Sequence, residues 1–140
     1  MSKTKHPIGL RTLFFTEMWE RMSYYGMRGI LVLFMTASIS NGGLDFSNTS
    51  ASAIYGIYAA AVYFMALPGG WLADNIFGQQ KTILFGGIVI MFGHLSLAIP
   101  NMTFFYLGLI LVVMGTGLLK PNISAIVGSL YEKNPSMKES

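Results

Sequence analysis

Cysteine is absent from this sequence, which excludes disulfide bonds and thiolate metal sites. Charged residues make up only 11% of the chain, whereas soluble domains carry roughly 25%. The few basic residues form no stripe of the kind that binds nucleic acid. No serine–histidine–aspartate, metal-ligand or phosphate-loop constellation is recognisable either. An enzyme is therefore the least supported class, and no cofactor is expected.

Hydrophobic residues are abundant instead, making up 53% of the chain in long runs. A membrane span needs roughly 20 mostly apolar residues, so the 140 residues hold about four spans and little else. The sequence therefore predicts an all-α integral membrane protein surrounded by a lipid bilayer. We expect transmembrane helices over about residues 12–40, 51–74, 82–99 and 104–131.

Helix breakers and small residues indicate the boundaries and contacts of these spans. The Asn-Gly-Gly cluster at 41–43 ends the first span, and a short polar loop at 75–81 separates the second from the third. Pro-Asn at 100–101 ends the third span, and Pro121 interrupts the fourth. Small residues at helical spacing predict close helix packing in lipid. They are Gly86, Gly87, Gly93, Gly115 and Gly117.

The distribution of lysine and arginine predicts the orientation. Cytoplasmic loops carry an excess of these residues, and here they lie in the N-terminal arm, the second loop and the C-terminal tail. Both chain ends are therefore expected in the cytoplasm. The polar, signal-free start favours a multi-pass protein of a bacterial inner (plasma) membrane. The residues concerned are Lys3, Lys5, Arg11, Lys81, Lys133 and Lys138.

Four charged residues lie inside the first expected helix, where each charge costs about 2.5–3.5 kcal/mol on insertion scales. At about 100° per residue they share an arc of roughly 140° with two tyrosines. Lipid cannot cover such a face, so it is expected to look into a bundle interior or a water-filled cavity. In the alternative, the first three charges snorkel to the headgroups. The face consists of Glu17, Glu20, Arg21, Tyr24, Tyr25 and Arg28.

Arg28 and Lys120 lie too deep in their expected helices to reach the headgroups. A desolvated lysine keeps its charge only beside a carboxylate, so Lys120 is expected near Glu17 or Glu20. With Arg21, the predicted cavity has three positive groups against two negative ones. This surplus suits a ligand with a carboxylate or another anionic group, which arginine can bind through two parallel hydrogen bonds.

Tyrosines add hydroxyl donors and flat apolar surface to this cavity. Tyr24, Tyr25 and Tyr63 are the candidates, because such side chains hold a small polar ligand without tight discrimination. His94 stands alone on the apolar third span. A solitary histidine of this kind is more often a packed residue than a proton relay, and the prediction leaves it outside the site.

Three motifs closely resemble those of the POT/PTR family within the major facilitator superfamily. The run EMWERMSYYGMR at 17–28 resembles the family's ExxER(F)xYYGMR signature on its first helix. GGWLAD at 69–74 is similar to the family's GGxxAD loop, and GTGLLKPN at 115–122 to its GxGxxKPN helix. The resemblance implies that the chain corresponds to the first four helices of a major facilitator N-terminal bundle.

The resemblance also implies roles for particular residues. Proton coupling is implied for Glu17, Glu20 and Lys120, with the carboxylates paired to Arg21 and Lys120. A cytoplasmic gating loop is implied for Gly70, Asp74 and Gly78. Substrate binding is implied for Arg21, Tyr24, Tyr25, Arg28, Tyr63 and Lys120.

The chain departs from the family pattern in two places. Some members place a histidine after an Ala-Ile-Tyr run on the second helix, whereas here the run at 53–55 is followed by Gly56. A histidine-dependent proton step at this position is therefore excluded, and the carboxylates become the candidates. The gating loop often carries arginine after its aspartate, whereas this chain has Asn75.

The function implied by the resemblance is proton-coupled symport of di- and tripeptides by alternating access, with protons as the coupling ion. The chain would supply the N-terminal wall of the central site, and the remaining helices of the same transporter would be its partners. It is therefore not expected to transport alone. Three alternatives stay open: a carrier of another small anion such as nitrate in the same family, a non-transporting structural membrane subunit, and a four-helix pump that works as a dimer.

Overall fold

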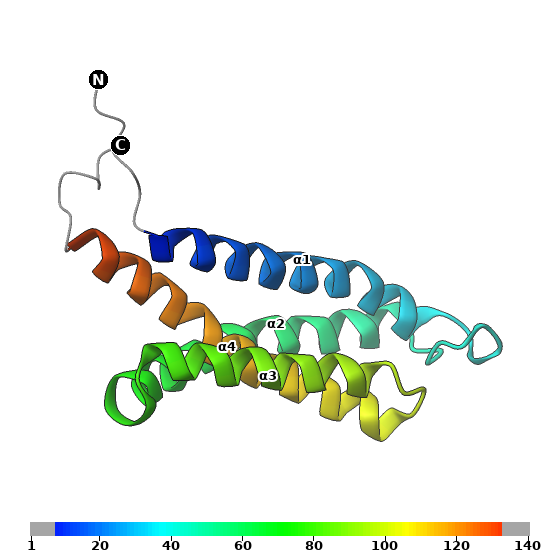
Figure 1. Cartoon of the computed structure of the whole chain (residues 1–140). Coiled ribbons are helices and arrows are strands. Elements are labelled where there is room, and N and C mark those ends of the chain that lie inside the picture. The colour runs from blue at the N-terminus through cyan, green and yellow to red at the C-terminus, as the bar shows by residue number, and fades with distance from the viewer. Residues whose placement is uncertain (1–7, 133–140) are drawn as a thin grey trace.

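The computed structural model describes residues 8–132, which form four long helices lying side by side (Figure 1). Helix α1 spans Ile8–Thr36, α2 Asn48–Leu72, α3 Gln79–Leu97 and α4 Met102–Glu132. Two short elements connect them, the 3-10 turn η1 at Ile39–Asn41 and the π-helical turn η2 at Ala73–Phe77. This part of the chain contains no strand, and the predicted all-α fold class is confirmed.

The end of α1 and the start of α2 differ from the expected residues, and the local backbone and a capping hydrogen bond account for the difference. α1 stops at Thr36, before its expected end near residue 40. Ser38 has an extended backbone with ψ 153°, and Gly42 a left-handed one with φ 79°. α2 begins before residue 51, because the Ser47 hydroxyl accepts a hydrogen bond from the Ser50 amide at 3.1 Å and caps the helix.

The predicted polar loop at 75–81 is almost entirely helical. α2 continues through η2, and only Gly78 lies outside a helix before α3 begins. Gly78 has φ 79°, a left-handed value that glycine adopts without strain. The three expected gating residues therefore do not form an open loop. Gly70 belongs to α2, Asp74 to η2, and Gly78 to the junction.

α4 is the central helix and packs along both α3 and α2. Glycines allow this approach, because a Cβ on most of the predicted packing glycines would lie no more than 3.0 Å from backbone atoms of the facing helix. Gly87 faces away, and a Cβ there would meet nothing within 4 Å. The close packing is thus confirmed for Gly86, Gly93, Gly115 and Gly117, whereas the prediction for Gly87 is wrong.

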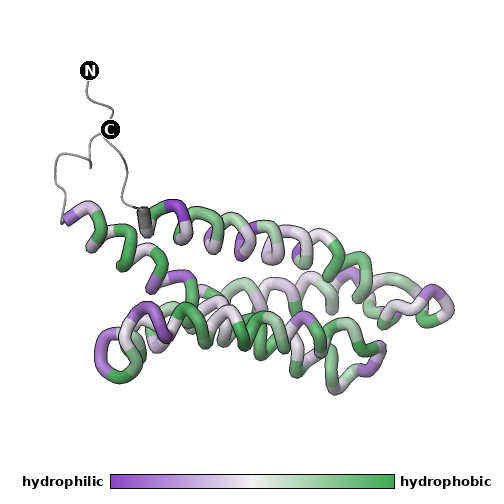
Figure 2. The backbone as a smooth tube through the Cα atoms, in the orientation of Figure 1, coloured by the Kyte–Doolittle hydropathy of each residue, from purple (hydrophilic) through white to green (hydrophobic). Residues whose placement is uncertain are grey.

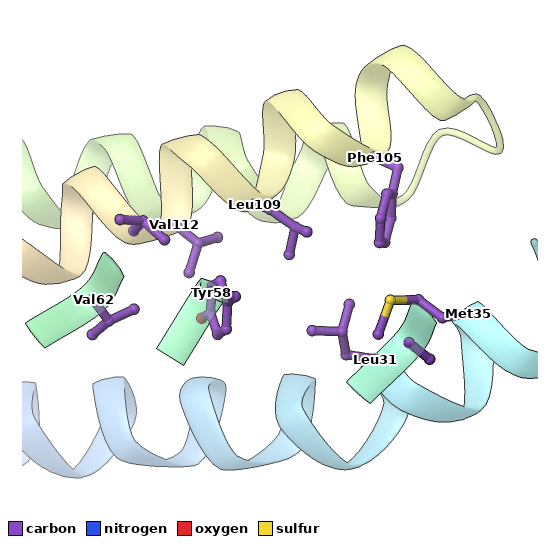
Figure 3. Close-up of a cluster of buried hydrophobic side chains, with 9 residues drawn as sticks. Leu31, Met35, Tyr58, Val62, Phe105, Leu109 and Val112 are labelled. Carbon is purple, nitrogen blue, oxygen red and sulfur yellow. The ribbon is translucent and has the colours of Figure 1, made fainter. Parts of the chain in front are cut away.

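A hydrophobic cluster between α1, α2 and α4 forms the core (Figure 3). Leu31 and Met35 come from α1, Tyr58 from α2, and Phe105 and Leu109 from α4, and none is more than 7% exposed. The outer surface is also strongly apolar, whereas hydrophilic residues gather at the helix ends and along α1 (Figure 2). Such a surface needs lipid or further protein around it.

Three helical segments in the described part of the chain are long and apolar enough to cross a membrane: Asn48–Phe77, Gln79–Leu97 and Met102–Glu132. α1 has 29 residues, which at roughly 1.5 Å per residue gives about 43 Å. This length exceeds a hydrocarbon core about 30 Å thick. The charges of α1, not its length, set it apart from the other three helices.

α2 and α4 are also joined by a polar contact. The buried Asn122 side chain donates a hydrogen bond to the Gly69 carbonyl of α2 at 3.3 Å. It donates another to the Leu118 carbonyl of its own helix at 2.6 Å. Hydrogen bonds between membrane helices contribute about 0.6–1.7 kcal/mol.

Asn122→Ala is therefore expected to lower the thermal unfolding temperature of the protein in detergent by a few degrees, because the Gly69 carbonyl loses its interhelical donor. Ser124 lies on the exposed side of the same helix, where its hydroxyl bonds only within α4. Ser124→Ala is the matched control and should leave the unfolding temperature unchanged. Equal shifts in the two variants would contradict the interhelical role of Asn122.

Candidate functional site

Arg21 joins the two carboxylates on the charged face of α1. Its Nη2 atom lies 3.5 Å from Glu17 Oε1, and its Nε atom lies 3.6 Å from Glu20 Oε2. The two carboxylates differ in exposure, since the Glu20 side chain is 7% exposed and the Glu17 side chain 48%. Glu20 is thus held inside the bundle, where the stability of its charge depends on its neighbours more than on water.

Lys120 is half-buried on α4 and points towards an aromatic ring. Its Nζ atom lies 5.0 Å from the centroid of the Tyr63 ring on α2, within reach of a cation–π interaction. Glu20 is close enough for the two charges to interact. Lys120 thus lies near Glu20 as expected. Within residues 8–132, however, the ion pairs are those of Arg21, and the implied pairing of Lys120 with a carboxylate is not formed.

Arg28 is likewise placed over an aromatic ring. Its guanidinium carbon lies 5.3 Å from the centroid of the Tyr55 ring on α2. Arg28 itself is exposed, as are Tyr25 and Tyr63, at 55% and 68%. These predicted binding residues therefore present a guanidinium and two aromatic rings on surfaces that the described helices do not cover.

Two tyrosines outside the predicted site lie beside it. Tyr55 contacts Arg28, and Tyr58 stacks on the half-buried Tyr24 with ring centroids 6.4 Å apart. Tyr58 is 3% exposed, and its hydroxyl has no hydrogen-bond partner within the described residues. The signal for both was their i, i+3 spacing, which places Tyr55 and Tyr58 on one face of α2.

His94, predicted to lie outside the site, reaches the polar face of α1. Its Nε2 atom forms a short hydrogen bond with the Ser23 hydroxyl. Ser23 follows Glu20 by three residues, so the two lie on the same side of α1 about one turn apart. Glu20, Ser23, His94 and the buried Thr116 of α4 line one small cavity. The feature of the sequence that could have indicated this contact is the position of His94 as a polar residue on an otherwise apolar span.

The predicted gating residues lie apart from this cluster, at the end of the bundle where α1 begins (Figure 1). Asp74 and Gly78 are exposed, and Gly70 is half-buried with its Cβ position 3.9 Å from Pro121. The Asn75 side chain donates to a backbone carbonyl of its own helix at 2.9 Å. This hydrogen bond therefore stabilises the π-helical turn η2 and does not reach a neighbouring helix.

The charged face of α1 and Lys120 of α4 together combine three cations with two carboxylates, a formal surplus of one positive charge (3 − 2). Tyrosine rings lie against two of the cations. Such a face can exchange the partner of a cation between an internal carboxylate and an anionic ligand. No group of three metal-ligating side chains occurs among residues 8–132. The basic residues Lys3, Lys5, Lys133 and Lys138 lie outside the described residues.

The chain is similar to transporters of one family over nearly its whole length. Residues 80–140 match PTR2, the POT family. The chain is 52% identical over 136 residues to the "Uncharacterized transporter YclF" of Bacillus subtilis (strain 168), covering 96% of this chain and 28% of the relative. It is 48% identical over 136 residues to the "Di-/tripeptide transporter" of Lactococcus lactis subsp. lactis (strain IL1403), covering 95% and 27%.

The fold is also similar to that of solved transporters. A crystal structure of a POT family transporter in complex with 5-aminolevulinic acid has 42% sequence identity and a TM-score of 0.90. The match covers 95% of this chain and 28% of that one. The chain thus spans 27% to 28% of the length of these relatives.

Proposed function

Because the chain belongs to the POT family, we propose that it forms one wall of the central site in a proton-coupled transporter of di- and tripeptides. The observation that carries this proposal is the Arg21 bridge between buried Glu20 and exposed Glu17, with Lys120 on a neighbouring helix. The similarity to a di-/tripeptide transporter supports peptides as substrates.

The proton step follows from the charges that surround Glu20. While Glu20 is ionised, it attracts Arg21 and Lys120. Protonation removes this attraction and frees both cations for the terminal carboxylate of a peptide. A proton and a peptide then favour the same state, and this differential binding links their movement.

The other candidate binding residues also suit a peptide. Arg28 can bind a carboxylate through two parallel hydrogen bonds, and Tyr24, Tyr25 and Tyr63 offer hydroxyls and flat apolar surface. These contacts address the terminal carboxylate and the backbone, which all short peptides share. A site built in this way accepts di- and tripeptides of varied sequence.

The remaining helices of the transporter are the proposed partners of the exposed surface of this multi-pass membrane chain. In alternating access two halves of the transporter rock about a central site, and Gly70, Asp74 and Gly78 are proposed to form the cytoplasmic gate. We place both chain ends in the cytoplasm of a bacterial inner membrane, following the lysine and arginine distribution. Protons are the proposed coupling ion, without a further cofactor or a catalysed reaction.

Uptake of labelled dialanine into proteoliposomes tests this proposal. The full-length transporter that contains this chain is given an inward proton gradient and compared with its Lys120→Ala variant. A hydrogen bond to a charged group contributes about 1.5–3 kcal/mol. Uptake at low peptide concentration is therefore expected to fall roughly tenfold or more. Lys81→Ala changes an exposed lysine near the start of α3 and is expected to keep full uptake.

The 140-residue chain alone is expected to give no uptake, because it supplies only part of the wall of the site. Uptake that ignores the proton gradient would contradict the coupling. Equal uptake by the Lys120→Ala variant and the unmodified transporter would contradict the site, and nitrate would then be the next substrate to measure.

A further inference from the structure

The hydrogen bond between Ser23 and His94 crosses a thinly packed boundary of the bundle. α1 and α3 are separated on either side of it by open cavities of about 460 and 280 Å³. Ser23 lines both cavities, and His94 lines the larger one. Direct contacts between the two helices are otherwise sparse within residues 8–132. This pair is therefore the polar link that joins α1 to α3.

The link lies about one helical turn from Glu20. Glu20 shares a small cavity with Ser23, His94 and Thr116. The volume in which the centre of a water molecule fits there is about 10 Å³. This is room for roughly one water. The cavity can therefore hold one water between Glu20 and the hydrogen-bonded pair. Because Glu20 and Ser23 belong to the same rigid helix, any shift of α1 at Ser23 also moves Glu20.

We propose that Ser23 and His94 form a tether that sets the position of Glu20 against Lys120, which makes His94 a positioning residue for the proton step. This inference rests on the proposed function. Release of the tether lets α1 shift into the flanking cavities, because few other contacts hold it against α3. The distance between Glu20 and Lys120 of α4 then changes, and with it the link between proton and peptide.

The charged neighbours decide how a change at His94 can act. Around His94 the described polar neighbours are Ser23 and Thr116, and Glu20 is the charged side chain in the shared cavity. A change at His94 therefore acts on the proton step through Glu20. The charged and titratable groups that face Glu20 are Glu17, Arg21 and Tyr24 on α1, Tyr58 on α2, His94 on α3 and Lys120 on α4.

A double-mutant cycle in the full-length transporter tests the tether. Ser23→Ala and His94→Leu each remove one partner, and each is expected to lower gradient-driven dialanine uptake roughly threefold to fifteenfold. Peptide exchange without a gradient should stay nearly unchanged, and the double variant should lose no more than the more impaired single variant. Ser23→Thr keeps the hydroxyl and should restore uptake, while Ser96→Ala on α3 is the matched control. Losses that multiply in the double variant, or exchange that falls together with uptake, would overturn the tether.

A second measurement does not depend on the substrate. The infrared band of the protonated Glu20 carboxyl group, identified by its loss in Glu20→Gln, reports the surroundings of that group. Ser23→Ala and His94→Leu are expected to shift the band and the midpoint of its pH titration in the same direction, with no further shift in the double variant. An unshifted band overturns the inference even if the transporter carries peptides. A shifted band in a protein that carries no peptide supports the tether and contradicts the proposed function.

Discussion

Gly69→Ala is expected to disrupt the packing of α2 against α4 and to lower the yield of folded protein sharply. A Cβ at Gly69 would overlap the carbonyl group of Gly117, and helix backbone cannot rotate away as a side chain can. Overpacking costs about 1–3 kcal/mol or more. Separation of the helices would also break the hydrogen bond from Asn122 to Gly69. The measurements are the yield of monodisperse protein and its thermal unfolding temperature in detergent.

Gly56→Ala provides the matched control on the same helix. A Cβ at Gly56 would meet nothing within 4 Å, and alanine is a better helix former than glycine. This variant is therefore expected to keep or slightly raise the unfolding temperature. If Gly69→Ala behaved in the same way, α2 and α4 could not approach each other as closely as the structure shows.

The helical fold could be predicted from the sequence because a bilayer leaves few alternatives to helices for long apolar runs. The ends of individual helices were predicted wrongly where one or two hydrogen bonds determine them, as at the Ser47 cap and at the π-helical turn η2 before Gly78. Hydropathy does not register such bonds. Gly86 and Gly87 were placed in the same packed face, yet successive residues point about 100° apart on a helix. Only Gly86 faces α4.

The charged face of α1 could also be predicted, because the helical period alone brings Glu17, Glu20 and Arg21 together. Partners from other helices could not be predicted in the same way. Lys120 contacts the Tyr63 ring instead of a carboxylate, and this depends on how α4 is rotated against α2. The partner of His94 lies 71 positions away along the chain, so spacing within one helix carried no information about it.

Glu20→Gln is expected to abolish gradient-driven uptake of dialanine by the full-length transporter while peptide exchange persists. Glutamine keeps the shape of the side chain but cannot take up or release a proton. Arg21 and Lys120 then remain free for the peptide carboxylate at every pH, so binding no longer depends on the proton. Exchange of one peptide for another requires no net proton movement and therefore continues. Uptake and exchange are measured in the same proteoliposomes.

Glu17→Gln is the matched comparison, because Glu17 lies one turn away on the same helix and contacts the same arginine. Its side chain is 48% exposed, against 7% for Glu20. Water therefore stabilises its charge in part, and its protonation changes the forces on Arg21 less. We expect a smaller loss of uptake than in Glu20→Gln. Equal losses in the two variants would show that burial does not select the proton site. Intact uptake in Glu20→Gln would show that Glu20 does not carry the proton and only forms an ion pair with Arg21.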